Sequence, residues 1–127
     1  MMELTINGQV YQFNFGMGFL REANKIKNPN AKTTDKNYGS RFLISGVIDG
    51  DPETLVDVLD LANKGQEPRV TKAALDAYID DPETNIDQLF EDTLDFLRKA
   101  NATRKLVTKM EEAFAKLQEI NQKIAEQ

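Results

Sequence analysis

The sequence has 127 residues, of which 29% are charged and 40% hydrophobic, and it contains no cysteine and no histidine. This length predicts one domain with a single hydrophobic core, and the composition is typical of a folded soluble protein. The missing cysteine and histidine remove disulfides, thiolate metal sites, the commonest zinc ligand and the commonest general base. We therefore expect no cofactor. No apolar run is long enough to span a membrane, and the N-terminus has no signal-peptide pattern.

The net charge of −5 is unevenly distributed along the chain. Residues 1–48 carry six Lys or Arg against three acids, residues 49–97 carry three against fourteen, and residues 98–127 carry seven against four. The three segments thus have net charges of +3, −11 and +3. This basic–acidic–basic order permits head-to-tail attraction between copies, although the solvated faces of an ordinary soluble protein give the same pattern.

The clearest strand signal lies in residues 2–15, where MELTI and QVYQF flank Asn7-Gly8. Asn-Gly is the preferred pair for a two-residue type I′ turn, so the sequence predicts an antiparallel hairpin in which Ile6 faces Gln9. One face of that hairpin carries Met2, Leu4, Ile6, Tyr11 and Phe13. A lone hairpin is marginal in water, so this face is expected to pack on helices or on another chain.

Two helices are expected before residue 50, separated by a polar loop. The first spans 16–27, and its inward face is expected to carry Met17, Leu20, Ala23 and Ile26. Residues 28–37 have no apolar periodicity and are expected to form a mobile surface loop. The second helix spans 38–48, and its inward face is expected to carry Tyr38, Phe42, Leu43, Ile44, Val47 and Ile48. Gly46 in this helix permits the close approach of another helix.

Residues 44–79 are interpreted as the organising core of the chain, a pair of helices with well-marked ends. Asp51 is a good N-cap, and Pro52 suits the first helical position. Apolar residues follow at helical spacing, namely Leu55, Val56, Leu59 and Ala62. Gly65 is the expected left-handed residue after this helix, and Thr71 can cap the next one. The apolar face of that second helix carries Ala74, Leu75, Tyr78 and Ile79.

The tetrapeptide DPET at 51–54 recurs at 81–84. We interpret the two copies as similar helix caps rather than as an internal duplication. Asn85 with Gln88 three residues later resembles a capping box, so another helix is expected to begin there. Its apolar face carries Leu89, Phe90, Leu94 and Leu97, with Phe96 beside it.

The last and longest helix is expected over residues 102–126, with a length of about 37 Å. Its apolar residues repeat at alternating spacings of four and three, which is the pattern of a heptad stripe. We define the C-terminal stripe as Leu106, Met110, Ala113, Phe114, Leu117, Ile120 and Ile124. The stripe either packs on the core of its own domain or binds a partner helix, and its last two turns run past what a domain of this size needs.

Three kinds of site are disfavoured by the sequence. A calcium loop beginning at Asp49 needs glycine at its sixth position, which is Thr54. Paired acids at 80–81 and 91–92 lie at helix starts or on polar faces, so we expect no metal site there. No phosphate-binding loop or activated nucleophile is present, so we expect no catalysis. A helix–turn–helix outline at 53–79 has an acidic second helix, which argues against nucleic-acid binding.

Two stretches carry a family resemblance, MELTINGQVYQFNFGMGFLREANK and ISGVIDGDPETLVDVLDLANKGQEPRVTKAALDAYIDDPETNIDQLFEDTLDFLRKANATRK. They are similar to the tail assembly chaperones of long-tailed phages and prophages of Gram-positive bacteria. The resemblance covers about residues 2–107. Its most telling pieces are the hairpin leading into FNFGMGFL and the block DVLDLANKGQEPRVT.

The resemblance implies a non-enzymatic assembly factor that binds the tape measure protein, keeps this long helical rod soluble and helps recruit tail tube subunits around it. It also implies action in the bacterial host cytoplasm, absence from the mature virion and, often in this family, a longer form made by translational frameshifting. The family supplies no catalytic residues, so we expect partner binding at the C-terminal stripe. Self-association through the stripe or the hairpin edge is a further expectation.

Two alternatives stay open at this point. One is a helical adaptor or regulatory protein with weak nucleic-acid contacts, and the other is a structural tail component that stays in the virion. In every case the sequence predicts a mainly α fold with a small N-terminal β-hairpin, of the α+β kind. The hairpin and a compact helical domain occupy residues 1–100, and an amphipathic helix, in the same domain or beyond it, occupies residues 101–127.

Overall fold

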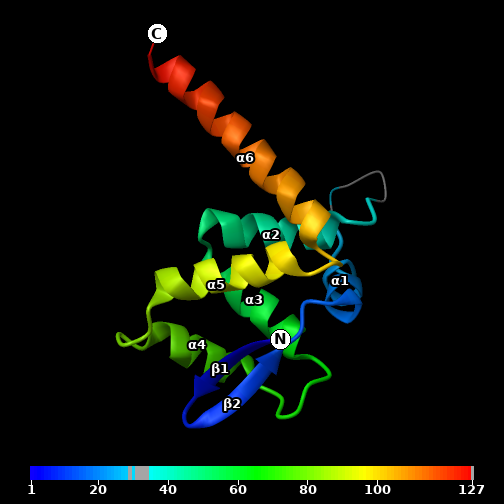
Figure 1. Cartoon of the computed structure of the whole chain (residues 1–127), viewed down its shortest axis with the longest axis vertical. Coiled ribbons are helices and arrows are strands. Elements are labelled where there is room, and N and C mark those ends of the chain that lie inside the picture. Colours follow the sequence, from blue (N-terminus) through cyan, green and yellow to red (C-terminus); the bar gives the residue numbers. More distant parts are fainter. Residues whose placement is uncertain (29, 31–34, 127) are drawn as a thin grey trace.

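A computed structural model of the chain describes residues 1–28, 30 and 35–126. Its elements are the strands β1 (Met2–Ile6) and β2 (Gln9–Phe13) and the helices α1 (Met17–Ala23), α2 (Tyr38–Asp49), α3 (Pro52–Asn63), α4 (Lys72–Asp80), α5 (Ile86–Lys99) and α6 (Arg104–Ala125). The predicted fold class, mainly α with a small β-hairpin, is confirmed (Figure 1). Half of the loop predicted over 28–37, residues 29 and 31–34, lies outside the described residues.

Helix α3 lies at the centre of the molecule, where it contacts α1, α2, α4 and β2. Its buried side chains point to several sides at once and are Thr54, Leu55, Val56, Val58, Leu59, Ala62 and Asn63. Both of its ends form as the sequence predicts. The Asp51 side chain accepts a hydrogen bond from the backbone N–H of Glu53, and Gly65 after the helix adopts a φ of +86°.

The N-terminal hairpin has the predicted register. Ile6 pairs with Gln9, and the turn residues Asn7 and Gly8 have φ values of 53° and 78°, the left-handed values that a type I′ turn requires. On the face turned toward the helices, the side chains of Met2, Ile6 and Phe13 are buried. The backbone N–H of Asn14 donates to the carbonyl of Ala62 at 2.8 Å, which ties the end of the hairpin to α3.

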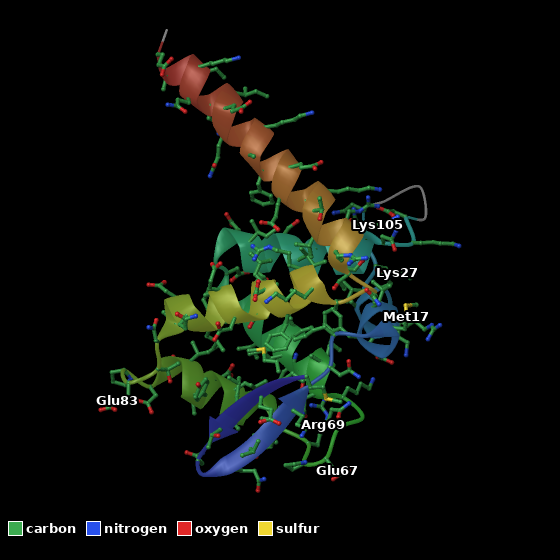
Figure 2. The ribbon with its side chains drawn as sticks, viewed as in Figure 1. Met17, Lys27, Glu67, Arg69, Glu83 and Lys105 are labelled. Carbon is green, nitrogen blue, oxygen red and sulfur yellow. The ribbon has the colours of Figure 1, made fainter. Side chains whose placement is uncertain are left out.

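Helix α1 differs from the prediction in length and in its inward face. It ends at Ala23 instead of residue 27, and Met17, which was expected inside, is 50% exposed and points outward (Figure 2). Phe19 is buried in its place and packs edge to face against Phe15, with ring centroids 5.3 Å apart. Residues two apart on a helix point about 200° apart, so Met17 and Phe19 cannot both face the core. Ile26, also expected inside, follows the helix and is 36% exposed.

Helix α2 buries Leu43, Ile44 and Val47 as predicted. The expected inward position of Phe42 is wrong, because its side chain is exposed and stacks on Tyr38 at a centroid distance of 6.0 Å. The predicted apolar face was wider than the surface that the neighbouring helices cover. The close approach predicted at Gly46 is confirmed, since a Cβ atom there would overlap the side chain of Thr54 on α3.

The second DPET segment does not cap the start of a helix as the first does, so the interpretation of two similar caps is wrong. Asp81 ends α4 and accepts a hydrogen bond from the N–H of Glu83, while the hydroxyl of Thr84 donates to the Tyr78 carbonyl at 2.6 Å. These bonds form a turn between α4 and α5. The first copy makes the same Asp-to-backbone bond, but only there does a helix follow directly.

The N-caps predicted for α4 and α5 are present. Thr71 accepts from the N–H of Ala74, and Asn85 accepts from the N–H of Gln88. The Gln88 side chain, however, donates to Asp92 at 2.8 Å. The reciprocal half of the predicted capping box is therefore replaced by a bond along the helix surface.

Candidate partner-binding surface

The base of α6 is held to the body by contacts to α5. The hydroxyl of Thr103 is buried and donates to the carbonyl of Leu97 at 2.6 Å, which fixes the bend between the two helices. One turn further on, the side chain of Val107 is fully buried. Helix α6 therefore starts inside the core, although it ends far from it (Figure 1).

An ion pair joins α5 to the second turn of α6. The Arg98 guanidinium donates to both carboxylate oxygens of Glu111, from Nε at 2.9 Å and from Nη2 at 3.1 Å. The Glu111 carboxylate raises the pKa of Arg98 above its usual value. Behind this pair, Lys99 bonds Asp95 at 2.7 Å and lowers the pKa of the Asp95 carboxyl.

The C-terminal stripe is divided between the core and the solvent. Leu106 and Met110 are half-buried and pack against the hydrophobic core, and Phe114 is half-buried where α6 passes over α2. Beyond Phe114 every residue from 115 to 126 is exposed. We refer to residues 115–125 as the free half of α6.

On the free half the stripe continues without cover. The exposed fractions of Leu117, Ile120 and Ile124 are 56%, 54% and 62%, and Ala113 just before them is exposed as well. The end of α2 lies beside Ala115 and Gln118, where Ile48 and Asp49 line a recess with them, and the helix beyond points away from the body (Figure 2). Three large aliphatic side chains on one face of a polar helix form an apolar patch of the kind that marks interaction sites.

A shallow groove joins the stripe to the body. Its volume is about 290 Å³, and it is lined by Phe42 of α2 and Phe114 of α6 together with Ser45, Gly46, Asp49, Asp51 and Thr54. Because Phe42 is half-exposed, its ring adds to the apolar surface that begins with Leu117. Sequence reasoning assigned Phe42 to the core and so missed it as part of this surface.

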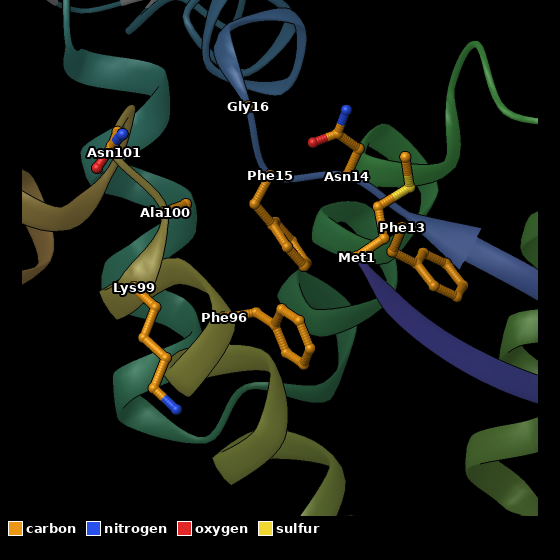
Figure 3. A pocket seen from close by; sticks show the side chains of 9 residues that line it. All are labelled: Met1, Phe13, Asn14, Phe15, Gly16, Phe96, Lys99, Ala100 and Asn101. Atoms are coloured by element: carbon orange, nitrogen blue, oxygen red, sulfur yellow. The ribbon is translucent and has the colours of Figure 1, made fainter.

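A second recess lies between the end of the hairpin and the end of α5 (Figure 3). Its volume is about 350 Å³, and the rings of Phe15 and Phe96 line it with their centroids 6.5 Å apart. Phe96 is 38% exposed there, and Lys99 borders the opening.

No group of three acidic side chains comes close enough to hold a metal ion within the part of the chain that the structure describes. None of the helices in that part is long and apolar enough to cross a lipid bilayer. Three further recesses are lined by residues of α1 and the segment before α2, of α3 and α4, and of α2 and α6.

The family model for phage tail assembly chaperone protein, TAC, matches residues 3–112. The chain belongs to this family. The resemblance inferred from the hairpin and the central helices is thereby confirmed, and the tail assembly chaperone match spans all elements from β1 to the first turns of α6. The free half of α6 lies beyond the matched residues. No curated protein and no solved structure gives a match.

Proposed function

We propose that this tail assembly chaperone binds the tape measure protein through the C-terminal stripe and the adjoining groove, and so keeps it soluble until tail tube subunits surround it. The observation that carries the proposal is the exposed run of Leu117, Ile120 and Ile124 on a helix that points away from the body. An amphipathic helix recognises another through such an apolar face. The proposal places this action in the host cytoplasm and requires no catalysis.

The size of the surface favours weak binding by many copies. Covering the exposed part of one aliphatic side chain contributes about 1 kcal/mol, so the three side chains and Phe42 together contribute about 4 kcal/mol. Association costs at least about that much in lost motional freedom. A single contact between one chaperone and the tape measure protein is therefore weak. Several chaperone copies bound along one tape measure protein, or several apolar stripes on that protein, protect it by mass action.

The test is co-expression with the tape measure protein encoded beside this chain, scoring that protein in the soluble fraction and in a pull-down. We expect rescue of solubility by the wild type and its loss with Leu117→Asp/Ile120→Asp. Met110→Asp is a poor substitute, because Met110 packs against the core and its replacement destabilises the domain.

The matched control is Gln122→Asp/Ala125→Asp, which adds the same charge to exposed positions of the free half outside the stripe. It should solubilise the tape measure protein as the wild type does. Failure of a folded wild-type chain to keep that protein soluble would overturn the function. Rescue by the Leu117→Asp/Ile120→Asp variant would leave the function standing and place the binding site elsewhere.

A further inference from the structure

Three lysines form a straight column along the edge of the C-terminal stripe. Lys109, Lys116 and Lys123 are seven residues apart, which is almost two helical turns, so they project from the same side of α6. Each precedes a stripe residue directly, and all three are exposed. We call these residues the lysine column.

The lysine column has no acidic partner among the described residues. The ion pair near the base of α6 uses Arg98 and Glu111, and no ion pair of the described chain includes a member of the column. A second column, of Glu112, Glu119 and Glu126, lies behind it on the side away from the stripe. On the opposite edge of the stripe the corresponding positions are neutral, for example Asn121.

We infer that the partner of the C-terminal stripe is an amphipathic helix whose own apolar stripe is bordered by acidic residues. This inference rests on the proposed function and specifies the chemistry of the segment that is bound. In paired helices the residues next to the apolar seam face each other across it and select the partner by charge. A cationic edge beside Leu117 and Ile124 therefore selects an anionic edge on the helix that covers them.

A second copy of this chain does not supply that edge. In an antiparallel pair of α6 helices the two lysine columns would face each other, and like charges in that position are repelled. In a parallel pair Lys116 would face Asn121 of the other copy, which offers no charge. The occupant that the charges favour is a different protein helix.

An anionic membrane surface also attracts basic amphipathic helices. Here the glutamate column stands directly behind the lysine column, so a broad anionic surface would meet both charges at once. A partner helix is narrower and touches the lysine edge alone. The observations therefore favour a helix over a lipid surface.

The experiment uses two synthetic helical peptides that share one apolar stripe, with Glu at every flanking position in the first and Lys in the second. Binding of the full-length chain is measured by fluorescence anisotropy at low salt. We expect the Glu-flanked peptide to bind about tenfold more tightly. Each exposed ion pair raises the logarithm of the affinity by at least a few tenths, and each like-charge pair lowers it by a similar amount. The preference should shrink at high salt.

The variant Lys116→Glu/Lys123→Glu should reverse the preference. Its matched control is Lys27→Glu/Lys36→Glu, which changes the net charge equally at exposed sites outside α6 and should retain the preference for the Glu-flanked peptide. Equal affinity of the two peptides, an equal effect of the control, or binding to phosphatidylglycerol vesicles without any peptide preference would overturn the inference.

The proposed function can survive that result. If both peptides bind equally and the tape measure protein is still solubilised in a stripe-dependent way, only the acidic partner chemistry is wrong. If neither peptide binds, the inference of an acidic partner helix is wrong, and if the tape measure protein also stays insoluble, both proposals fail together.

Discussion

The guanidinium of Arg98 on α5 and the carboxylate of Glu111 on α6 meet in two parallel hydrogen bonds of 2.9 and 3.1 Å. A planar fork joined to a planar carboxylate fixes direction as well as distance. Both side chains are 36% exposed, so the energy of the pair is modest. Its main effect is to set the angle at which α6 leaves the body.

We expect Glu111→Gln to change the free energy of unfolding by less than about 1 kcal/mol and to loosen α6. Because the chain has no cysteine, spin labels placed by Ala77→Cys and Ile120→Cys can report the distance from α4 to the free half by pulsed EPR. The distance distribution should broaden in Glu111→Gln. Glu112→Gln is the control and should leave it unchanged. An unchanged distribution in both variants would show that Thr103 and Val107 suffice to hold the helix.

Gly46 on α2 faces Thr54 on α3 so closely that no side chain fits between them. We expect Gly46→Ala to lower the free energy of unfolding by about 1 to 3 kcal/mol, because an added methyl group must push the two helices apart. Gly18→Ala is the control, since a Cβ atom there meets nothing within 4 Å and alanine favours the helix. Urea unfolding measures both, and equal midpoints for the two variants would contradict the close approach.

The features that the sequence predicted correctly are set by neighbouring residues. Asn7-Gly8 fixed the hairpin register, and Asp51 and Thr71 marked helix starts, because a turn or a cap needs only a few consecutive residues. The alternating apolar spacing of α6 likewise identified its stripe. In each case the physical cause lies within the segment itself.

The features that the sequence did not predict depend on residues distant along the chain. Phe19 replaced Met17 on the inward face of α1 because Phe15 packs against it, and Phe42 is exposed because no helix of the described chain covers that side of α2. The pairing of Arg98 on α5 with Glu111 on α6 is another contact that the sequence pattern did not predict. An apolar pattern indicates which faces of a helix can be buried, but not which of them a neighbour reaches.

Asn63 at the end of α3 is such a long-range feature, because its buried side chain joins three segments. Its Nδ2 donates to the carbonyls of Gln12 at 2.9 Å and Pro68 at 3.2 Å, while its Oδ1 accepts from the N–H of Val70 at 2.7 Å. The side chain thus links β2, α3 and the loop that leads to α4.

We expect Asn63→Asp to lower the free energy of unfolding by about 3 kcal/mol. The new carboxylate oxygen would face two carbonyl oxygens in a buried site, and both carbonyls would lose their donor. Asn101→Asp is the control at an exposed position and should cost less than about 0.5 kcal/mol. Urea unfolding at neutral pH compares them, and similar midpoints would argue against a structural role for Asn63.

Glu22 on α1 makes stability depend on pH. Its carboxylate accepts from Lys25 at 2.7 Å and from Lys64, the residue after α3, at 2.8 Å, and these bonds lower the pKa of Glu22 from 4.5 to about 2. A carboxyl whose pKa is lower in the folded state stabilises the protein above its unfolded pKa. That contribution is lost as the pH falls from about 4.5 to about 2.

Glu22→Gln should therefore be less stable than the wild type at neutral pH, and the difference should disappear as the pH approaches about 2. Thermal unfolding of both proteins at a series of pH values measures the difference. Glu119→Gln on the free half of α6 is the control, and its difference from the wild type should stay near zero throughout. A Glu22→Gln difference that persists at low pH would show that the ion pairs do not cause it.

Truncation after Phe114 separates the folded body from the proposed binding surface. Because residues 115–126 are all exposed, their removal deletes almost no tertiary contact, and the urea midpoint should match that of the full chain.

Truncation after Leu106 removes the fully buried Val107 and the Glu111 carboxylate and should unfold the protein or destabilise it strongly. Truncation after Phe114 also removes Leu117, Ile120 and Ile124 with the whole free half, so this variant should stay folded yet fail to solubilise the tape measure protein. If it still solubilises that protein, the binding surface lies on the body, where the recess between Phe15 and Phe96 is the next site to test.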